Sequence, residues 1–354
     1  MKELKLGKVK IGGNNRTAII CEIGVDHMGS MEKARKMIDA AKACGADIAK
    51  FQIHQPTVEM VPNHPATKFH GGSLTDVFKK SHLTAEQHRE LKEYCEKVGI
   101  QYLCTPFCPS SVDLLNDVTK VDGFKTGSGE VTNLPHHRRL AQISAKTGKP
   151  VLVSTGMCTM DEIAETVAVY KEEGALDNLV LTVCTSEYPL EKYNDISLGL
   201  IPKMRDLFGV WVGYSDHSKD NRIAMAAVAM GAKVIEKHFT LAYDESGCDD
   251  SVALTPAMFK ELVEGIRRVE STLGSEKIVR PEEWKTRSWA FHSILTNKPI
   301  RKGGAITDKN TRPGRPGVGI PAKYWDKKYS AALFGRSVKH DLPKDHVLQW
   351  EDLV

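Results

Sequence analysis

The stretch from residue 213 to residue 240 reads GYSDHSKDNRIAMAAVAMGAKVIEKHFT and contains a strand, a helix and a second strand. A β-rich run that starts at Val210 ends in Ser-Asp-His217, and a run that starts at Ala232 ends in Lys-His238. Between them, residues 221–231 are rich in Ala and Met and end in glycine, which predicts a helix. The unit therefore places one histidine at the exit of each strand.

The same alternation of β-rich runs and helical spacing extends over most of the chain. The β-rich runs lie at residues 17–23, 47–52, 100–104, 121–125, 150–154, 179–184, 210–214 and 233–238. Eight strands that alternate with helices over about 250 residues are typical of a (β/α)8 TIM barrel. A doubly wound open sheet is the alternative, but no Gly-rich nucleotide-binding turn follows the first strand.

The character of the sequence changes after a last helical segment at residues 256–273. Residues 274–287 are polar, and the short β-rich runs that follow are separated by Lys302-Gly-Gly and by the Pro- and Gly-rich residues 312–320. This pattern indicates a small second domain with little regular structure. We predict a barrel over residues 1–280, a linker over 281–292 and the small domain over 293–354.

Charge, hydropathy and cysteine content limit the classes of function that the chain could have. A net charge of +4 over 354 residues suits an anionic small substrate but is too weak to indicate nucleic-acid binding. The apolar runs are too short to cross a membrane, and the charged N-terminus has no apolar signal core, which predicts a cytoplasmic protein. Eight cysteines without a CxxC pair fit a reducing compartment.

Polar side chains follow every predicted strand, where a TIM barrel carries its catalytic residues. Two lysines, Lys50 and Lys125, and the hydroxyls of Thr105, Ser128, Ser154 and Ser215 form a set suited to phosphate and carboxylate groups. A surface loop position is the alternative for each lysine. Both lie inside apolar runs, however, where a charged side chain needs a buried anionic partner, and this favours function.

The two histidines could converge on one divalent ion, because parallel strands exit at the same edge of a sheet. His217, His238 and a nearby acid such as Asp249 or Glu236 would leave coordination positions open for water and substrate, so the ion could polarise a carbonyl oxygen. The alternative is that each histidine is a satisfied polar residue at a strand end. Glu22, at the same edge, could move protons or hold a substrate hydroxyl, or it could simply pair with a lysine.

Eight blocks at the strand exits together resemble the sialic acid synthase family. They are Glu22-Ile-Gly-Val-Asp-His-Met-Gly29, Ala49-Lys-Phe-Gln52, Thr105-Pro-Phe107, Phe124-Lys-Thr-Gly-Ser-Gly-Glu130, Ser154-Thr-Gly-Met157, Cys184-Thr-Ser-Glu-Tyr-Pro189, Gly213-Tyr-Ser-Asp-His217 and Ile235-Glu-Lys-His-Phe-Thr240. The later block Arg315-Pro-Gly-Val-Gly-Ile320 is similar to the signature of that family's SAF domain, which resembles type III antifreeze proteins.

The resemblance implies an enzyme that condenses phosphoenolpyruvate with an N-acetylmannosamine-type aldose to give a nine-carbon nonulosonic acid and phosphate. It implies a divalent metal, most often Mn2+ with Mg2+ or Co2+ as alternatives, on His217 and His238. Phosphoenolpyruvate would contact Lys50, Thr105, Lys125, Ser128, Ser154 and Ser215. The sugar would contact Glu22, Gln52, Tyr188 and Asp249. It would also contact Arg315 of the partner chain in a domain-swapped homodimer.

The sequence departs from the family pattern near the expected sugar position. The family usually has Asn where this chain has Asp26, and Gly-Pro-Asp or Gly-Ser-Asp where it has Gly247-Cys248-Asp249. Sister synthases that make legionaminic or pseudaminic acid from a 2,4-diacetamido-6-deoxy sugar are therefore an alternative. Deoxy-octulosonate synthases are more remote because of the SAF-like tail. A further alternative is a non-catalytic glycan- or ice-binding protein. Such a protein would be expected to have lost the polar residues at the strand exits, whereas this chain keeps the matched lysines and histidines.

Overall fold

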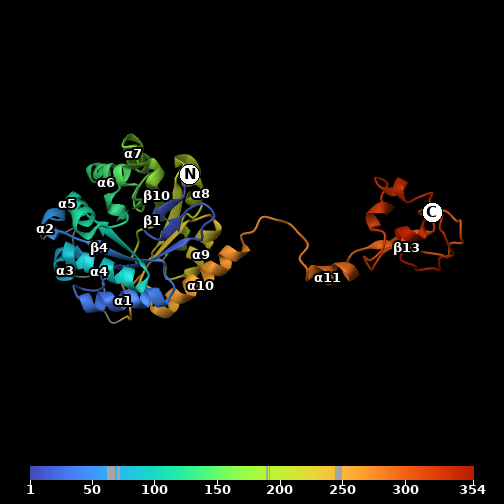
Figure 1. The fold of residues 1–354 in the computed structure, drawn as a ribbon, viewed down its shortest axis with the longest axis horizontal. Coiled ribbons are helices and arrows are strands. Elements are labelled where there is room, and N and C mark those ends of the chain that lie inside the picture. The colour runs from blue at the N-terminus through green and yellow to red at the C-terminus, as the bar shows by residue number, and fades with distance from the viewer. Residues whose placement is uncertain (62–67, 70–71, 189, 191, 244–248) are drawn as a thin grey trace. The chain divides into compact units, whose positions relative to one another are not determined.

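The computed structural model describes residues 1–61, 68–69, 72–188, 190, 192–243 and 249–354 (Figure 1). The chain divides into two compact units, Met1–Gly274 and Ser275–Val354. Within the described residues, no helix is both long and apolar enough to cross a membrane.

The first unit is built on a sheet of eight strands in the order β7-β4-β3-β12-β11-β10-β9-β8. The strands are β3 (Ala18–Gly24), β4 (Ile48–Ile53), β7 (Gln101–Pro106), β8 (Phe124–Thr126), β9 (Val151–Ser154), β10 (Leu179–Cys184), β11 (Trp211–Asp216) and β12 (Val234–His238). Each hydrogen-bonded pair is parallel. The two end strands, β7 and β8, pack against each other and close the barrel. The predicted (β/α)8 barrel is thereby confirmed, and the open-sheet alternative is wrong.

Helices cover the outside of the barrel (Figure 1). They are α1 (Met31–Ala43), α4 (Ala85–Val98), α5 (Pro109–Leu114), α6 (Leu134–Thr147), α7 (Met160–Glu172), α8 (Leu200–Phe208), α9 (Asn221–Ala229) and α10 (Pro256–Thr272). Thr84 and Thr159 begin their helices with capping boxes, and Gly99 and Gly148 end theirs in the left-handed conformation. These local signals are why the helical segments could be placed from the sequence.

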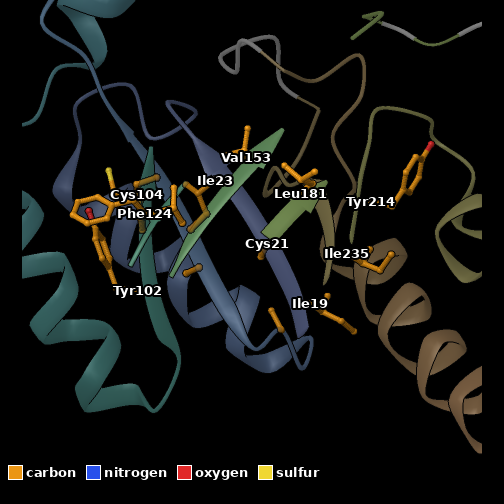
Figure 2. Close-up of a cluster of buried hydrophobic side chains, with 14 of the residues drawn as sticks. Ile19, Cys21, Ile23, Tyr102, Cys104, Phe124, Val153, Leu181, Tyr214 and Ile235 are labelled. Atoms are coloured by element: carbon orange, nitrogen blue, oxygen red, sulfur yellow. The ribbon is translucent and has the colours of Figure 1, made fainter. Parts of the chain in front are cut away.

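Alternation along the strands separates the core from the site. On β3, Ile19, Cys21 and Ile23 pack into the layer between strands and helices, as Figure 2 shows for this strand and its neighbours. Ala18 and Ile20 belong to a second cluster, inside the barrel. Glu22 continues the series of Ala18 and Ile20. Because side chains alternate with a period of two residues, it also points into the barrel, above the inner cluster.

A hairpin that the sequence did not reveal closes the other end of the barrel. Strands β1 (Leu4–Leu6) and β2 (Val9–Ile11) pair antiparallel, and Leu4, Leu6 and Ile11 are buried against the inner cluster. Each strand has three residues, too few to show a period. The hairpin covers the inner cluster at the end where the strands begin, opposite the exit end.

The segment after β4 contains several short elements. These are α2 (Pro56–Glu59), the paired strands β5 (Lys68–Phe69) and β6 (Gly72–Ser73), and α3 (Leu74–Ser81). The helix α3 supplies residues of the site described below.

The second unit has its own core and little regular structure. It contains α11 (Glu283–Ala290), the antiparallel strands β13 (Ser293–Thr296) and β14 (Thr311–Gly314), and several short 3-10 turns. Ile294, Ile306, Ile320 and Leu348 lie in its buried cluster. The helix α11 falls within the stretch predicted as a linker, residues 281–292.

Candidate active site

A cavity of about 480 Å³ lies at the exit end of the barrel strands. Its lining includes all twelve site residues that the sequence predicts within the barrel, namely Glu22, Lys50, Gln52, Thr105, Lys125, Ser128, Ser154, Tyr188, Ser215, His217, His238 and Asp249. They come from seven of the eight barrel strands or from the loops that follow the strands. The structure thus brings the predicted residues together, although their roles remain predictions.

One wall of the cavity is a buried group of lysines and carboxylates. The Lys50 ammonium lies 3.3 Å from Glu22 and 3.2 Å from Glu236, and Lys125 lies 3.7 Å from Glu236. Lys125 also donates to the Ser154 hydroxyl at 2.6 Å. Glu236 is therefore the shared anionic partner of both lysines, and it keeps them charged inside the barrel.

The pKa values of this group follow from burial and neighbouring charge. Burial opposes ionisation of Glu236, but Lys125 and Lys50 outweigh it and lower the pKa of Glu236 to about 2. Burial lowers the pKa of Lys125 to about 8, because attraction to Glu236 offsets burial only in part and the Lys50 charge opposes protonation. Burial also works against the charge of Lys50, yet Glu22 and Glu236 raise its pKa. Lys125 is the cation that titrates most easily.

The opposite wall carries the two histidines, whose ring centres are 5.2 Å apart. The Nδ1 of His217 lies 2.8 Å from the carbonyl oxygen of Thr185, and the Nδ1 of His238 lies 2.9 Å from Asp249 Oδ2. Both partners only accept hydrogen bonds, so each Nδ1 carries a proton, and in the neutral ring the lone pair then lies on Nε2. Tyr188 donates its hydroxyl to Nε2 of His217 at 2.8 Å.

This arrangement fits a divalent metal, because ligand histidines usually bind through one nitrogen while the other donates to a carbonyl or carboxylate. Asp249 supports His238 from behind through Nδ1, and Glu236 is engaged with the lysines. Among the described residues, no group of three or more His, Cys, Asp or Glu side chains could hold a metal ion. The two Nε2 atoms are the ring nitrogens that could act as ligands to such an ion.

Glu22 lies between the two walls, because it pairs in register with Lys50 on β4 and with His238 on β12. Its Oε1 accepts from the Gln52 amide at 2.7 Å, while its Oε2 pairs with Lys50. The carboxylate is almost completely buried. Glu22 thus pairs with a lysine, which was the alternative to a role in proton transfer or substrate binding. It also lines the cavity.

Several cavity residues could not be assigned a role from the sequence. Glu236 was expected only as a possible metal ligand, whereas it contacts Lys50, Lys125 and Ser215, which lie on three other strands. Cys184, which had no predicted role, lines the cavity with its Sγ 3.7 Å from Nδ1 of His217. An apolar side is formed by Leu74, Val77 and Phe78 of α3 together with Phe107. Only Phe107 had a sequence signal, as part of the Thr105-Pro-Phe107 block.

Arg315, the remaining predicted site residue, belongs to the second unit. Its Nε donates to the carbonyl oxygen of Ala290 at 3.0 Å, and its guanidinium lies 5.8 Å from the ring centre of Trp289. Of the Gly247-Cys248-Asp249 departure, the first two residues lie outside the described residues.

Comparisons with known proteins match most of the chain. The NeuB family profile matches residues 37–278, and the SAF domain profile matches residues 292–354. An uncharacterized protein of Methanocaldococcus jannaschii is 38% identical over 100% of this chain and 99% of its own length. The N,N'-diacetyllegionaminic acid synthase of Campylobacter jejuni is 36% identical over 88% of this chain and 94% of its own length.

A solved structure shows the same architecture. The N-acetylneuraminic acid synthetase of Leptospira borgpetersenii, crystallised with citrate, superposes with a TM-score of 0.71 at 30% identity, covering 80% of this chain and 95% of the other. The chain is therefore an enzyme of the NeuB family, the sialic acid synthases, and carries a C-terminal SAF domain.

Proposed function

We propose that the protein condenses phosphoenolpyruvate with an N-acylated mannosamine-type aldose, in its open-chain aldehyde form, to give a nine-carbon nonulosonic acid and phosphate. The observation that carries the proposal is the pair of buried lysines, Lys50 and Lys125, which face His217 and His238 across one cavity. The lysine wall suits a phosphorylated carboxylic acid, and the histidine wall suits a carbonyl oxygen.

Phosphoenolpyruvate would bind along the lysine wall. Lys50 and Lys125 supply the positive charge, and the hydroxyls of Thr105, Ser128, Ser154 and Ser215 supply hydrogen bonds to phosphate and carboxylate oxygens. Because the lysines are buried, their attraction for the phosphate is little screened by water. A preorganised group of this kind typically contributes several kcal/mol to stabilising a leaving phosphate.

The chemistry would form one bond and break another at phosphoenolpyruvate. The C2–C3 double-bond electrons attack the aldehyde carbon, a carbon–carbon bond forms, and C2 becomes an oxocarbenium ion. The aldehyde oxygen becomes an alkoxide and takes up a proton, while water adds to C2 and loses one. The resulting C2 hydroxyl then loses its proton and becomes the ketone as phosphate leaves with the bridging oxygen, by cleavage of the C–O bond. Glu22, which lies at the junction of the two walls, is placed to take up or return a proton.

A divalent ion, most readily Mn2+ and alternatively Mg2+ or Co2+, would be held by Nε2 of His217 and of His238. When bound, it would supply Lewis-acid polarisation of the aldehyde oxygen. Support comes from the two Nδ1 hydrogen bonds, which place the lone pair of each neutral ring on Nε2. In this structure the Tyr188 hydroxyl donates to Nε2 of His217, and it would have to turn away from this nitrogen for an ion to bind there.

A second sugar class is favoured by the apolar side of the cavity. Leu74, Val77 and Phe78 would suit a 2,4-diacetamido-6-deoxy sugar, whose C6 methyl group is apolar. The product would then be a legionaminic or pseudaminic acid.

The test is to incubate the purified protein with phosphoenolpyruvate, Mn2+ and a panel of N-acylated aldoses, and to measure phosphate release. The panel contains N-acetylmannosamine, its 6-phosphate and the 2,4-diacetamido-6-deoxy sugar. Aldose-dependent release supports the proposal and ranks the sugars. Absence of turnover with every aldose would overturn it.

We further infer a domain-swapped homodimer in which Arg315 of the partner chain contacts the sugar. Mixing Arg315→Ala with a barrel variant such as Lys125→Met is therefore expected to restore part of the activity. One barrel in each mixed dimer would combine intact Lys125 with intact Arg315, and with random exchange up to about a quarter of all sites would recover. The measurement is phosphate release after the two variants are unfolded and refolded together. Activity no higher than the sum of the separately refolded variants would contradict the trans arrangement.

A cytoplasmic location is part of the same proposal. All seven described cysteines are free thiols, which is usual in a reducing compartment.

The pKa of Lys125 predicts how activity depends on pH. With a pKa of about 8, Lys125 is charged at lower pH and loses its proton as the pH rises through that value. We expect kcat/KM for phosphoenolpyruvate to be constant below this pH and to fall by up to about tenfold per unit above it. Rates measured from pH 6.5 to 9.5 at saturating aldose, with Lys125→Arg as the variant that stays charged, check this. A wild-type profile that stays flat to pH 9.5 would contradict it.

A further inference from the structure

Behind Gln52, the cavity wall continues into a buried histidine held between two phenyl rings. The His54 ring centre lies 3.6 Å from that of Phe78, with 11° between the ring planes, and 4.1 Å from that of Phe107, with 15°. Two nearly parallel rings this close cannot share one face of the imidazole, so they cover opposite faces. His54 follows β4, Phe78 lies on α3 and Phe107 follows β7, so the stack joins α3 to the barrel.

Both ring nitrogens of His54 face oxygen atoms. Nε2 lies 3.1 Å from Gln52 Oε1, and Nδ1 lies 2.8 Å from Glu59 Oε2. The other Glu59 oxygen accepts from the backbone N–H of Gln55. The side chains of His54 and Glu59 are 3% and 7% exposed, so water does not compete for these bonds.

The orientation of the Gln52 amide follows from its other neighbour. A carboxylate only accepts, so the amide nitrogen must face Glu22, to which it donates at 2.7 Å. The amide oxygen then faces His54, and Nε2 of His54 must carry a hydrogen. One further proton lies between Nδ1 and Glu59, on either atom. The Nε2–H is present in both cases, and the hydrogen-bonded chain runs from Glu59 through His54 and Gln52 to Glu22.

We propose that His54 is a positioning residue for the condensation, fixing the Gln52 amide with its nitrogen toward Glu22 and its second N–H available to the sugar. The proposal rests on the proposed function. Without the Nε2–H, the Gln52 amide could rotate by half a turn, which would set its oxygen against the Glu22 carboxylate and reverse the polarity of the sugar side. The same ring, through Phe78, also holds the apolar wall of α3 against the barrel.

The test uses a substitution that keeps the flat ring and removes both hydrogen bonds. His54→Phe is expected to lower kcat/KM for the best aldose by about tenfold or more, because a misplaced substrate-positioning group costs up to about 10²-fold, and to leave KM for phosphoenolpyruvate within about twofold. If His54 acts through Gln52, His54→Phe made in a Gln52→Ala background should cost no further activity. Additive losses in the double variant would overturn the proposal, as would an unchanged aldose kcat/KM in His54→Phe.

A second measurement does not depend on turnover. In the nitrogen-15 NMR spectrum of histidine-labelled protein, His54 is expected to show a protonated Nε2 whose signal disappears in His54→Phe and shifts in Gln52→Ala. An unprotonated Nε2 would overturn the proposal, because such a nitrogen cannot donate to the Gln52 oxygen. If the wild type turned over no aldose but showed this signal, the proposed function would fail while the positioning of Gln52 stood.

Discussion

Replacing His217 by alanine is expected to reduce phosphate release by about 10³-fold or more while the barrel stays folded. The proposed ion would lose one of its two protein ligands, and the aldehyde would lose its polarising partner. His217 lies at an exit, between Tyr188 and the Thr185 carbonyl, and not in the layer of apolar side chains that holds strands to helices. Stability should therefore change much less than activity.

The measurement is phosphate release as a function of Mn2+ concentration, together with the unfolding temperature and calorimetric Mn2+ binding. His238→Ala should behave like His217→Ala. The control is His340→Ala in the second unit, which pairs with Asp352 and is exposed at 57% of its side chain. It should keep wild-type activity. Full metal-dependent activity in His217→Ala would remove the metal role from this site.

Replacing Lys125 by methionine is expected to lower kcat/KM for phosphoenolpyruvate by about 10²- to 10³-fold. Methionine fills a similar volume but brings no charge to the phosphate. The change also leaves the Glu236 carboxylate with Lys50 as its remaining cation, and this carboxylate would repel the substrate. Both effects act on substrate binding and on the leaving phosphate, so KM should rise and kcat should fall.

Initial rates over a range of phosphoenolpyruvate concentrations check this prediction. The exposed lysine Lys146 on α6 offers the matched control, since Lys146→Met removes the same charge from a surface position. It should change kcat/KM by less than twofold. An unchanged kcat/KM in Lys125→Met would mean that phosphate binds elsewhere in the cavity.

The barrel could be predicted because its signals are local. Each strand is a short β-rich run, each helix has its own apolar spacing, and glycines such as Gly99 and Gly148 mark the ends. The hairpin of β1 and β2 could not, because three-residue strands carry no period and their burial depends on contacts with residues such as Leu103 and Leu152 far along the chain.

The site was predictable as a set of residues but not as a network. Polar residues at strand exits, together with the family blocks, identified the lining. The sequence could not show that Glu236 joins Lys50 to Lys125, because the three lie on β12, β4 and β8 and meet only across the closed barrel. Asp249 was expected as a possible metal ligand. In the structure it contacts Nδ1 of His238, on the side of the ring away from Nε2. The helix α3 follows a stretch rich in proline and glycine, and this composition gave no indication of a helix there.

The central claim is that this cavity joins phosphoenolpyruvate to an aldose with cleavage of the C–O bond. It is tested most directly with phosphoenolpyruvate that carries oxygen-18 in the bridging position between C2 and phosphorus. In the presence of Mn2+ and the preferred aldose, the label is expected in the released phosphate, and release should stop when the aldose is left out. Label retained in the carbon product, or release at the same rate without aldose, would contradict the claim.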